Sequence, residues 1–80
     1  MVTQFYIIEI KRNTNGELEH NVTWVFDTDS EKARLKAESA YYSLLSQAAV
    51  SEFATHSVTL ITDIGVPIMN YCYKHSADPE

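Results

Sequence analysis

The chain has few cysteines, glycines and positive charges, and each shortage excludes a class of protein. Its single cysteine, Cys72, cannot form a disulfide within the chain, which argues against a secreted disulfide scaffold and fits a reducing cytosol. Both glycines, Gly16 and Gly65, lie in expected turns, so the sequence lacks a glycine-rich phosphate loop. The net charge of -5 has the wrong sign for binding phosphates, and we therefore expect no general nucleic-acid binding.

Long apolar runs are missing as well. No stretch reaches the ~18 apolar residues that a membrane span requires, and residues 1–4 lack the basic region of a secretory signal. We therefore expect a soluble protein without a membrane partner, which stays in the cytoplasm where it is made.

The length of 80 residues permits a single domain, 1–80, with a thin hydrophobic core. Chains of this size commonly gain stability from disulfides, a bound metal or the burial of a second surface in an oligomer. Because disulfides within the chain are excluded, the sequence favours self-association into a homo-oligomer.

The first part of the chain predicts a β-hairpin with strands at about 3–12 and 17–26. A two-residue Asn-Gly turn would mix apolar and polar faces, so we expect a three-residue loop, 14–16, with Gly16 left-handed. The resulting register pairs Ile8 with Val22, Tyr6 with Trp24 and Lys11 with Glu19. In this arrangement the large ring of Trp24 is expected to anchor the core.

A helix is predicted at about 29–49. Thr28 and Glu31 have the spacing of a capping box, which favours a helix start there. Small and apolar residues then recur at intervals of three and four, at Ala33, Ala37, Ala40, Tyr41, Leu44, Leu45 and Ala48. The small side chains on this stripe allow the helix to approach a sheet closely.

The remainder predicts a second hairpin with strands at about 56–62 and 67–74, followed by a frayed tail at 76–80. The expected order is ββαββ. The fold class is therefore α+β, with an antiparallel four-stranded sheet and one helix packed on one of its faces.

One helix covers only one face of such a sheet, so apolar residues on the other face would be exposed to solvent unless a partner buries them. We expect this second face to form the contact between subunits, through the apolar residues Phe5, Ile7, Val25, Ile61 and Ile68. On this interpretation Ile7→Glu dissociates the oligomer without unfolding it, whereas Trp24→Ala unfolds the subunit. The alternative is that these apolar residues lie at protected strand ends or under loops.

The densest side-chain chemistry lies in Tyr71-Cys72-Tyr73-Lys74-His75. Strand alternation places Tyr71, Tyr73 and His75 on one face and Cys72 and Lys74 on the other. Rings that stack on a planar group, beside cations that meet an anion, suit a nucleotide-like ligand. The candidate ligand-binding residues are Tyr42, Tyr71, Tyr73, Lys74, His75, Lys11 and Arg12. The alternative is that the tyrosines belong to the core or an interface and that the cations only flank a turn.

Catalytic and metal-binding patterns are weak. Cys72 and His75, together with His56 and with His20 as a further candidate, form a metal-like set. Residues three apart on a strand point to opposite faces, so we expect no metal. A nucleophilic Cys72 would need an oriented base that the sequence does not indicate. We therefore expect no catalytic residue, no cofactor and no enzymatic activity.

Several short segments carry a resemblance to a known group of proteins. They are Lys36-Ala37-Glu38-Ser39, Tyr41-Tyr42, Ala48-Ala49-Val50-Ser51, His56-Ser57, Gly65-Val66-Pro67 and Tyr71-Cys72-Tyr73-Lys74-His75. Over roughly its C-terminal half the chain resembles small uncharacterised proteins encoded by phages and prophages of Firmicutes. The resemblance brings no catalytic residues with it, and it implies a virion accessory or an antagonist of host defence.

The residues and the resemblance together predict a non-enzymatic, homo-oligomeric binding protein in the cytoplasm of the host bacterial cell. It would antagonise host defence by sequestering a small nucleotide-like signal or by blocking a host protein. The alternative is a structural virion or assembly accessory protein.

Overall fold

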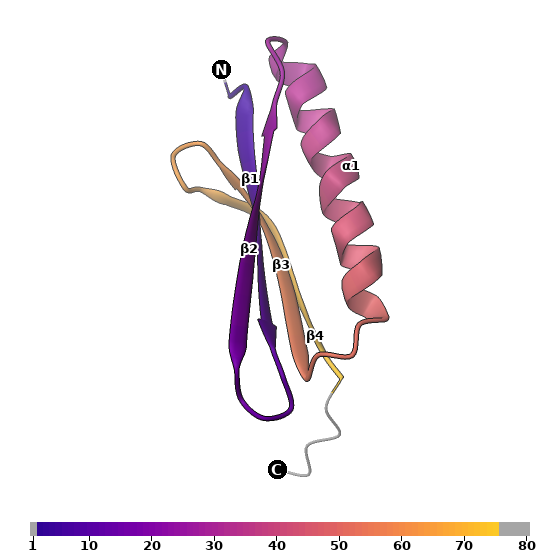
Figure 1. Ribbon diagram of the computed structural model, residues 1–80. Coiled ribbons are helices and arrows are strands. Elements are labelled where there is room, and N and C mark those ends of the chain that lie inside the picture. The colour runs from indigo at the N-terminus through magenta and orange to yellow at the C-terminus, as the bar shows by residue number, and fades with distance from the viewer. Residues whose placement is uncertain (1, 76–80) are drawn as a thin grey trace.

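The computed structural model describes residues 2–75, which form four strands and one helix in the predicted order ββαββ (Figure 1). The elements are β1 (Gln4–Arg12), β2 (Leu18–Phe26), α1 (Ser30–Ala49), β3 (Thr55–Thr62) and β4 (Pro67–Lys74). The four strands form one antiparallel sheet, which confirms the predicted α+β fold class. The predicted tail, 76–80, lies outside the described residues.

The strand order in the sheet is β2-β1-β3-β4, so each hairpin contributes one central and one edge strand. The two hairpins meet where β1 pairs with β3, a contact between segments that the whole of α1 separates along the chain. This central pairing sets Ile7 opposite Leu60 and Glu9 opposite Val58. It therefore determines which side chains of the two hairpins share a face.

The first hairpin has the predicted register. Ile8 pairs with Val22 and Tyr6 pairs with Trp24. The amide of Asn13 donates to the carbonyl of Glu17 at 2.8 Å, which closes a three-residue loop. Gly16 in this loop has a φ of 92°, a left-handed conformation that a residue with a Cβ rarely adopts. The loop length and the glycine position both confirm the prediction.

The helix begins one residue later than the capping box predicted. Asp29, rather than Thr28, is the N-cap, because its carboxylate accepts hydrogen bonds from the amides of Glu31 and Lys32. Asp27, just before the helix, forms an ion pair with Lys36 at 2.7 Å. The hydrogen bond from Lys36 is the main reason why the pKa of Asp27 lies below its usual value.

The hydrophobic core lies between α1 and one face of the sheet (Figure 1). Its buried side chains are Phe5, Ile7, Ala33, Ala37, Tyr41, Ala48, Val58 and Leu60. The alanines of the helix let its backbone approach the sheet, as the spacing of small residues predicted. We refer to the side of the sheet that faces away from α1 as the open face.

The structure reverses the predicted roles of the two sheet faces. Phe5 and Ile7, predicted to lie in the subunit contact, are buried under α1, and Val25 packs against the same core. The prediction that they form an exposed patch is therefore wrong. The reason is the central strand β3, whose apolar residues Val58 and Leu60 both face the helix and bring the paired side chains of β1 to the same side.

The two remaining residues of the predicted patch lie elsewhere. Ile61 is paired with Tyr6 and lies on the open face, as predicted. Ile68 falls at an irregularity in the pairing of β3 with β4, where it is exposed beside Glu31 and Arg34 of α1. The predicted patch is thus divided between both sides of the sheet.

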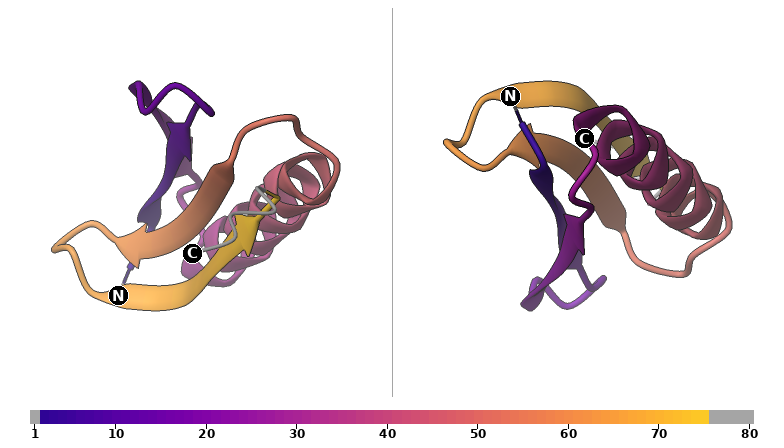
Figure 2. Two further views of the ribbon diagram at one scale, coloured as in Figure 1. Left: turned by 90° about the horizontal axis from the view of Figure 1, so that it is seen from below. Right: turned by 90° about the horizontal axis from the view of Figure 1, so that it is seen from above.

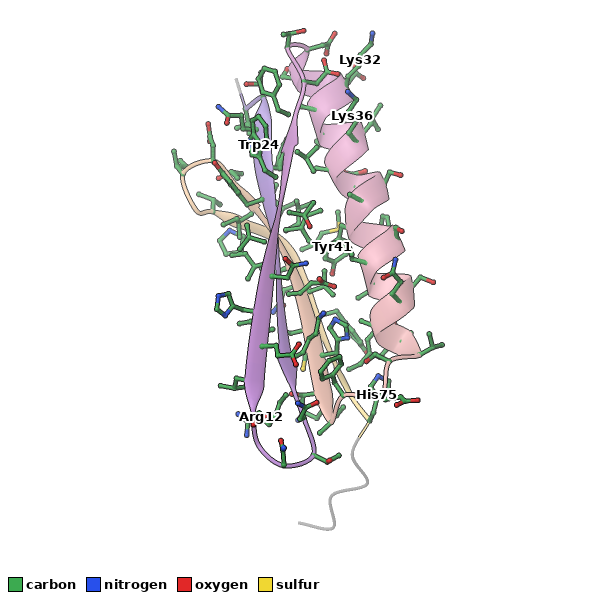
Figure 3. The ribbon with its side chains drawn as sticks, viewed as in Figure 1. Arg12, Trp24, Lys32, Lys36, Tyr41 and His75 are labelled. Carbon is green, nitrogen blue, oxygen red and sulfur yellow. The ribbon has the colours of Figure 1, made fainter. Side chains whose placement is uncertain are left out.

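The prediction that Trp24 anchors the core is also wrong. Its side chain lies on the open face and is 58% exposed (Figure 3). The indole Nε1 donates to Oε1 of Gln4 at 3.1 Å, and the ring stacks on Phe26 with centroids 5.7 Å apart. Trp24 therefore belongs to an aromatic surface and not to the core.

The sheet is strongly twisted, as Figure 2 shows. The turn between β1 and β2 lies away from α1, so the helix does not cover that end of the hairpin. Leu18 at the start of β2 lies on the open face and is exposed. Within residues 2–75, no helix is both long enough and apolar enough to cross a membrane.

Candidate functional site

An open groove of about 520 Å³ lies between α1 and the edge strand β4. Its lining residues are Tyr41, Tyr42, Leu45, Ile68, Met69, Asn70, Tyr71 and Tyr73. We refer to it as the tyrosine groove. Tyr41 and Tyr42 come from the helix, and Tyr71 and Tyr73 come from the helix-facing side of β4, where strand alternation places them together.

The tyrosine rings contact one another on each wall of the groove. Tyr71 and Tyr73 meet edge to face with centroids 4.7 Å apart, and Tyr41 and Tyr42 meet in the same way at 5.5 Å. The hydroxyl of Tyr42 also donates to Sδ of Met69 at 3.6 Å, which joins the two walls. Three of the predicted ligand-binding residues, Tyr42, Tyr71 and Tyr73, are therefore brought together.

His75 extends the aromatic row beyond the groove. Its imidazole stacks on the ring of Tyr73 with centroids 5.8 Å apart and an angle of 7° between the planes. Its Nε2 donates to the carbonyl of Ala48 at 2.7 Å, and its amide donates to the carbonyl of Ala54. His75 thus ties the end of β4 to the end of α1, where the carbonyl of Ala48 also accepts from the amide of Ser51 (Figure 3).

The predicted cations do not line the groove. Lys11 lies with its Nζ 5.4 Å from the ring centroid of Phe53, a cation–π contact. Arg12 and Lys74 flank Thr55 in one cross-strand row, which places both on the open face. The sequence-based grouping of tyrosines with cations is therefore only half correct, because alternation along β4 separates Lys74 from Tyr73.

The groove is therefore lined by apolar side chains and aromatic rings, whose polar groups are the tyrosine hydroxyls and the amide of Asn70. None of its lining residues is acidic or basic. Burial raises the pKa of Tyr41, and the neighbouring Tyr42 and Tyr73 raise it further. The phenol of Tyr41 is therefore neutral at physiological pH. The tyrosine rings of the groove can stack on a flat group while their hydroxyls donate or accept hydrogen bonds.

A second cluster, which the sequence analysis missed, is buried between the sheet and the loop after α1. Nε2 of His56 lies 3.3 Å from Oε2 of Glu9, and Nδ1 lies 3.0 Å from Oγ of Ser51. Asn21 donates to the second oxygen of Glu9 at 3.3 Å. The sequence does contain one indication of this cluster. Glu9 is a carboxylate on the same face of β1 as the apolar Phe5 and Ile7, so it needs a buried polar partner.

This cluster has the hydroxyl, imidazole and carboxylate of a nucleophilic site. Its imidazole and carboxylate are buried, however, and the cluster connects the loop after α1 to the sheet. An ionised carboxylate only accepts, so Nε2 of His56 donates to Glu9, while Nδ1 on the other side of the ring pairs with the hydroxyl of Ser51. The ring is only 4% exposed, and Phe53 packs edge-on against it. The hydrogen bonds thus hold the loop after α1 against the sheet.

The thiol and imidazoles that resembled a metal set do not converge. Cys72 pairs with Ser57 on the open face, whereas His56 and His75 lie on the helix side. No group of three metal-binding side chains occurs among residues 2–75.

The open face divides across its width into an apolar and a polar half. The apolar half, on β1 and β2 with one residue from β3, consists of Tyr6, Ile8, Ile10, Leu18, Val22, Trp24, Phe26 and Ile61. The polar half, on β3 and β4, carries Thr55, Ser57, Thr59, Asn70, Cys72 and Lys74. Its Thr59 donates to the side chain of Asn70 at 2.9 Å. The apolar half is an exposed apolar surface of the kind that the sequence predicted, but of the predicted residues only Ile61 belongs to it.

Comparisons with protein-family models, with curated proteins and with solved structures found no match to this chain.

Proposed function

We propose that this chain is a non-enzymatic, homo-oligomeric binding protein that blocks a host protein. In this proposal the tyrosine groove holds one aromatic or apolar side chain of the partner. The observation that carries it is a groove lined by four tyrosines and by no charged residue. Tyrosine supplies a large contact area at a low cost in side-chain entropy and is enriched in the residues that dominate protein interfaces.

The charge distribution favours a protein partner over a nucleotide-like signal. A nucleotide needs cations or helix amides near its phosphates, and Lys11, Arg12 and Lys74 all lie outside the groove. The resemblance to proteins of Firmicutes phages supports a bacterial host cell as the setting. We therefore propose that the protein acts in the host cytoplasm as an antagonist of host defence, by stoichiometric occupation of its target.

The groove can be tested with N-acetyltryptophanamide, an uncharged probe that carries one aromatic side chain. We expect it to shift the amide resonances of Tyr42, Asn70 and Tyr71 in a two-dimensional NMR titration. Tyr71→Ser should weaken binding several-fold, since the exposed ring forms one wall of the groove. Tyr6→Ser, a matched change on the open face, should leave the affinity unchanged. Shifts that are insensitive to Tyr71→Ser would contradict the proposal.

A second titration separates the two kinds of ligand. Because the lining of the groove carries no cation, AMP should bind no more tightly than adenosine. A clear preference for AMP, with shifts at the groove, would favour sequestration of a nucleotide-like signal.

The alternative function, a structural virion or assembly accessory protein, has support from a different observation. The apolar half of the open face is the kind of broad surface through which structural proteins assemble. This alternative predicts that the protein co-purifies with intact phage particles, whereas a blocking protein should remain in the soluble fraction of infected cells.

A further inference from the structure

Carboxylates are missing from the open face of the strands that the structure describes. The chain has 11 Asp and Glu residues and a net charge of -5. Yet every paired position on the open face within residues 2–75 is apolar, uncharged polar or basic. The two strong cations, Arg12 and Lys74, share the row at one end of the sheet. Two copies of this face can therefore approach without bringing carboxylates of these strands into contact with one another.

The open face is also large enough for a dimer. The longest strands have 9 residues. At ~3.3 Å per residue and ~4.8 Å between strands, the four-stranded sheet measures ~30 by ~19 Å, or ~570 Å² in projection. The relief of the side chains increases the accessible area toward the ~800 Å² per partner that stable complexes bury. A second copy of the chain presents a face of matching size.

The division of the open face into two halves selects one orientation. A two-fold axis along the strands would set β2 of one copy against β4 of the other, so the apolar half would face hydroxyls and amides. It would also place both rows of Arg12 and Lys74 against each other. An axis across the strands instead sets β2 against β2 and moves the two basic rows to opposite ends.

We propose that the open face binds a second copy of this chain through a two-fold axis that runs across the strands near Val22 and Ile8. This inference rests on the proposed self-association and specifies its geometry. Val22 and Ile8 lie in the middle row of the apolar half, so each faces its own equivalent in the other copy. Trp24, one row away, faces His20 of the partner subunit. The tyrosine grooves, on the other side of the sheet, stay open at the outside of the dimer.

The axis can be tested by cross-linking a single thiol. In a Cys72→Ser background, Val22→Cys carries the only cysteine of the chain. A short bis-maleimide bridges the ~10 Å between packed sheets. We expect it to convert most of this variant to a covalent dimer at micromolar concentration. Leu35→Cys in the same background is the control, because Leu35 lies on α1 and is 53% exposed, as is Val22. It should give only a trace of dimer from random collisions.

Light scattering on the unreacted variants makes each outcome decisive. A dimer that cross-links through Val22→Cys supports the proposed axis. A dimer that gives no such product, or that cross-links only when Val22→Cys is mixed with Asn70→Cys, overturns the axis but leaves self-association intact. Monomers at every concentration overturn both. None of these results depends on binding in the tyrosine groove, which the titration with N-acetyltryptophanamide measures separately.

Discussion

Ile7 of β1 lies directly opposite Leu60 of β3, and both side chains are fully buried beneath α1. This pair joins the two hairpins at the centre of the sheet. It also determines which face of each hairpin is covered, because successive side chains along β1 and β3 alternate between the two faces. The side that Ile7 occupies is the core, and the side of its neighbours Tyr6 and Ile8 is the open face.

Replacing Ile7 should therefore destabilise the subunit itself. We expect Ile7→Ala to lower the free energy of unfolding by about 2 to 5 kcal/mol, because it leaves a cavity in a small core. Ile7→Glu should unfold the chain, since a domain of this size has only ~5 kcal/mol to lose. Urea denaturation followed by circular dichroism measures both. Leu35→Ala on the outside of α1 is the control and should cost less than about 1 kcal/mol. Equal losses in the two alanine variants would contradict this assignment of the core.

Most of the fold was predictable from local patterns. The loop of the first hairpin follows from the position of Gly16 and from the match of apolar parities between its strands. The single helix follows from the spacing of its small residues. The pattern that predicts the hairpin and the pattern that predicts the helix each involve residues close together in the chain; the helix, for example, has 20 residues.

The assignment of the faces was not predictable in the same way. Both parities of β1 carry apolar residues, so the strand alone does not choose a face. The choice depends on the pairing of β1 with β3, which brings Ile7 against Leu60 across a long stretch of chain. No local pattern specifies that register. The apolar parity that Trp24 shares with Val22 and its large ring therefore predict a core position that the structure does not bear out.

The helix cap offers a test of a smaller feature. Asp29→Ala should lower the free energy of unfolding by about 1 kcal/mol, because it removes the carboxylate that accepts from two helix amides. Thr28→Ala is the matched control and should be close to neutral. Denaturation curves of the two variants decide between them, and a larger loss in Thr28→Ala would favour the cap that the sequence indicated.

The buried cluster around His56 should contribute measurably to stability. His56→Ala leaves Glu9 buried with Asn21 as its remaining side-chain partner, and we expect a loss of about 2 to 4 kcal/mol in the free energy of unfolding. Ser51→Ala removes one hydrogen bond and should cost about 1 kcal/mol.

Because Ser51 and His56 interact directly, the double variant should lose less than the sum of the two single losses. A double-mutant cycle from urea denaturation measures this coupling. Strictly additive losses would indicate that the hydrogen bond between the two side chains contributes nothing.

The candidate site was only partly predictable. Alternation along β4 correctly grouped Tyr71, Tyr73 and His75. The contribution of α1 to the groove depends on how the helix crosses the sheet, which the sequence does not reveal. Alternation also places Lys74 on the opposite face from Tyr73, which keeps this cation out of the groove. Lys11 lies on the helix side, but it contacts Phe53 outside the groove.

Tyr41 should make stability depend on pH in the alkaline range. Burial raises the pKa of its phenol above the usual 10.0, so the folded state holds this proton more tightly than the unfolded state. The resulting stability is fully present below pH 10.0 and is lost as the pH rises through the pKa of the folded state. Urea denaturation from about pH 9 to about pH 12 measures this decline. Tyr41→Phe should show a smaller decline, and an identical one would contradict the assignment.

The apolar half of the open face makes a clear prediction about oligomeric state. Val22→Glu places a carboxylate in the middle of a surface where the described strands carry none, and it should separate the subunits without unfolding them. Trp24→Ala should also weaken the assembly while the circular dichroism spectrum stays that of a folded chain, because the ring packs on the open face. A loss of folded structure in Trp24→Ala would show that this residue stabilises the subunit itself, and would contradict its place on the open face.

The most direct test of the account is light scattering during size-exclusion chromatography of the natural protein, Val22→Glu and Leu35→Glu. The two replaced side chains are equally exposed, at 53%. We expect a dimer for the natural protein and for Leu35→Glu, and a folded monomer for Val22→Glu. A natural protein that elutes as a monomer, or a Val22→Glu variant that remains dimeric, would contradict the central claim that the open face joins two copies of this chain.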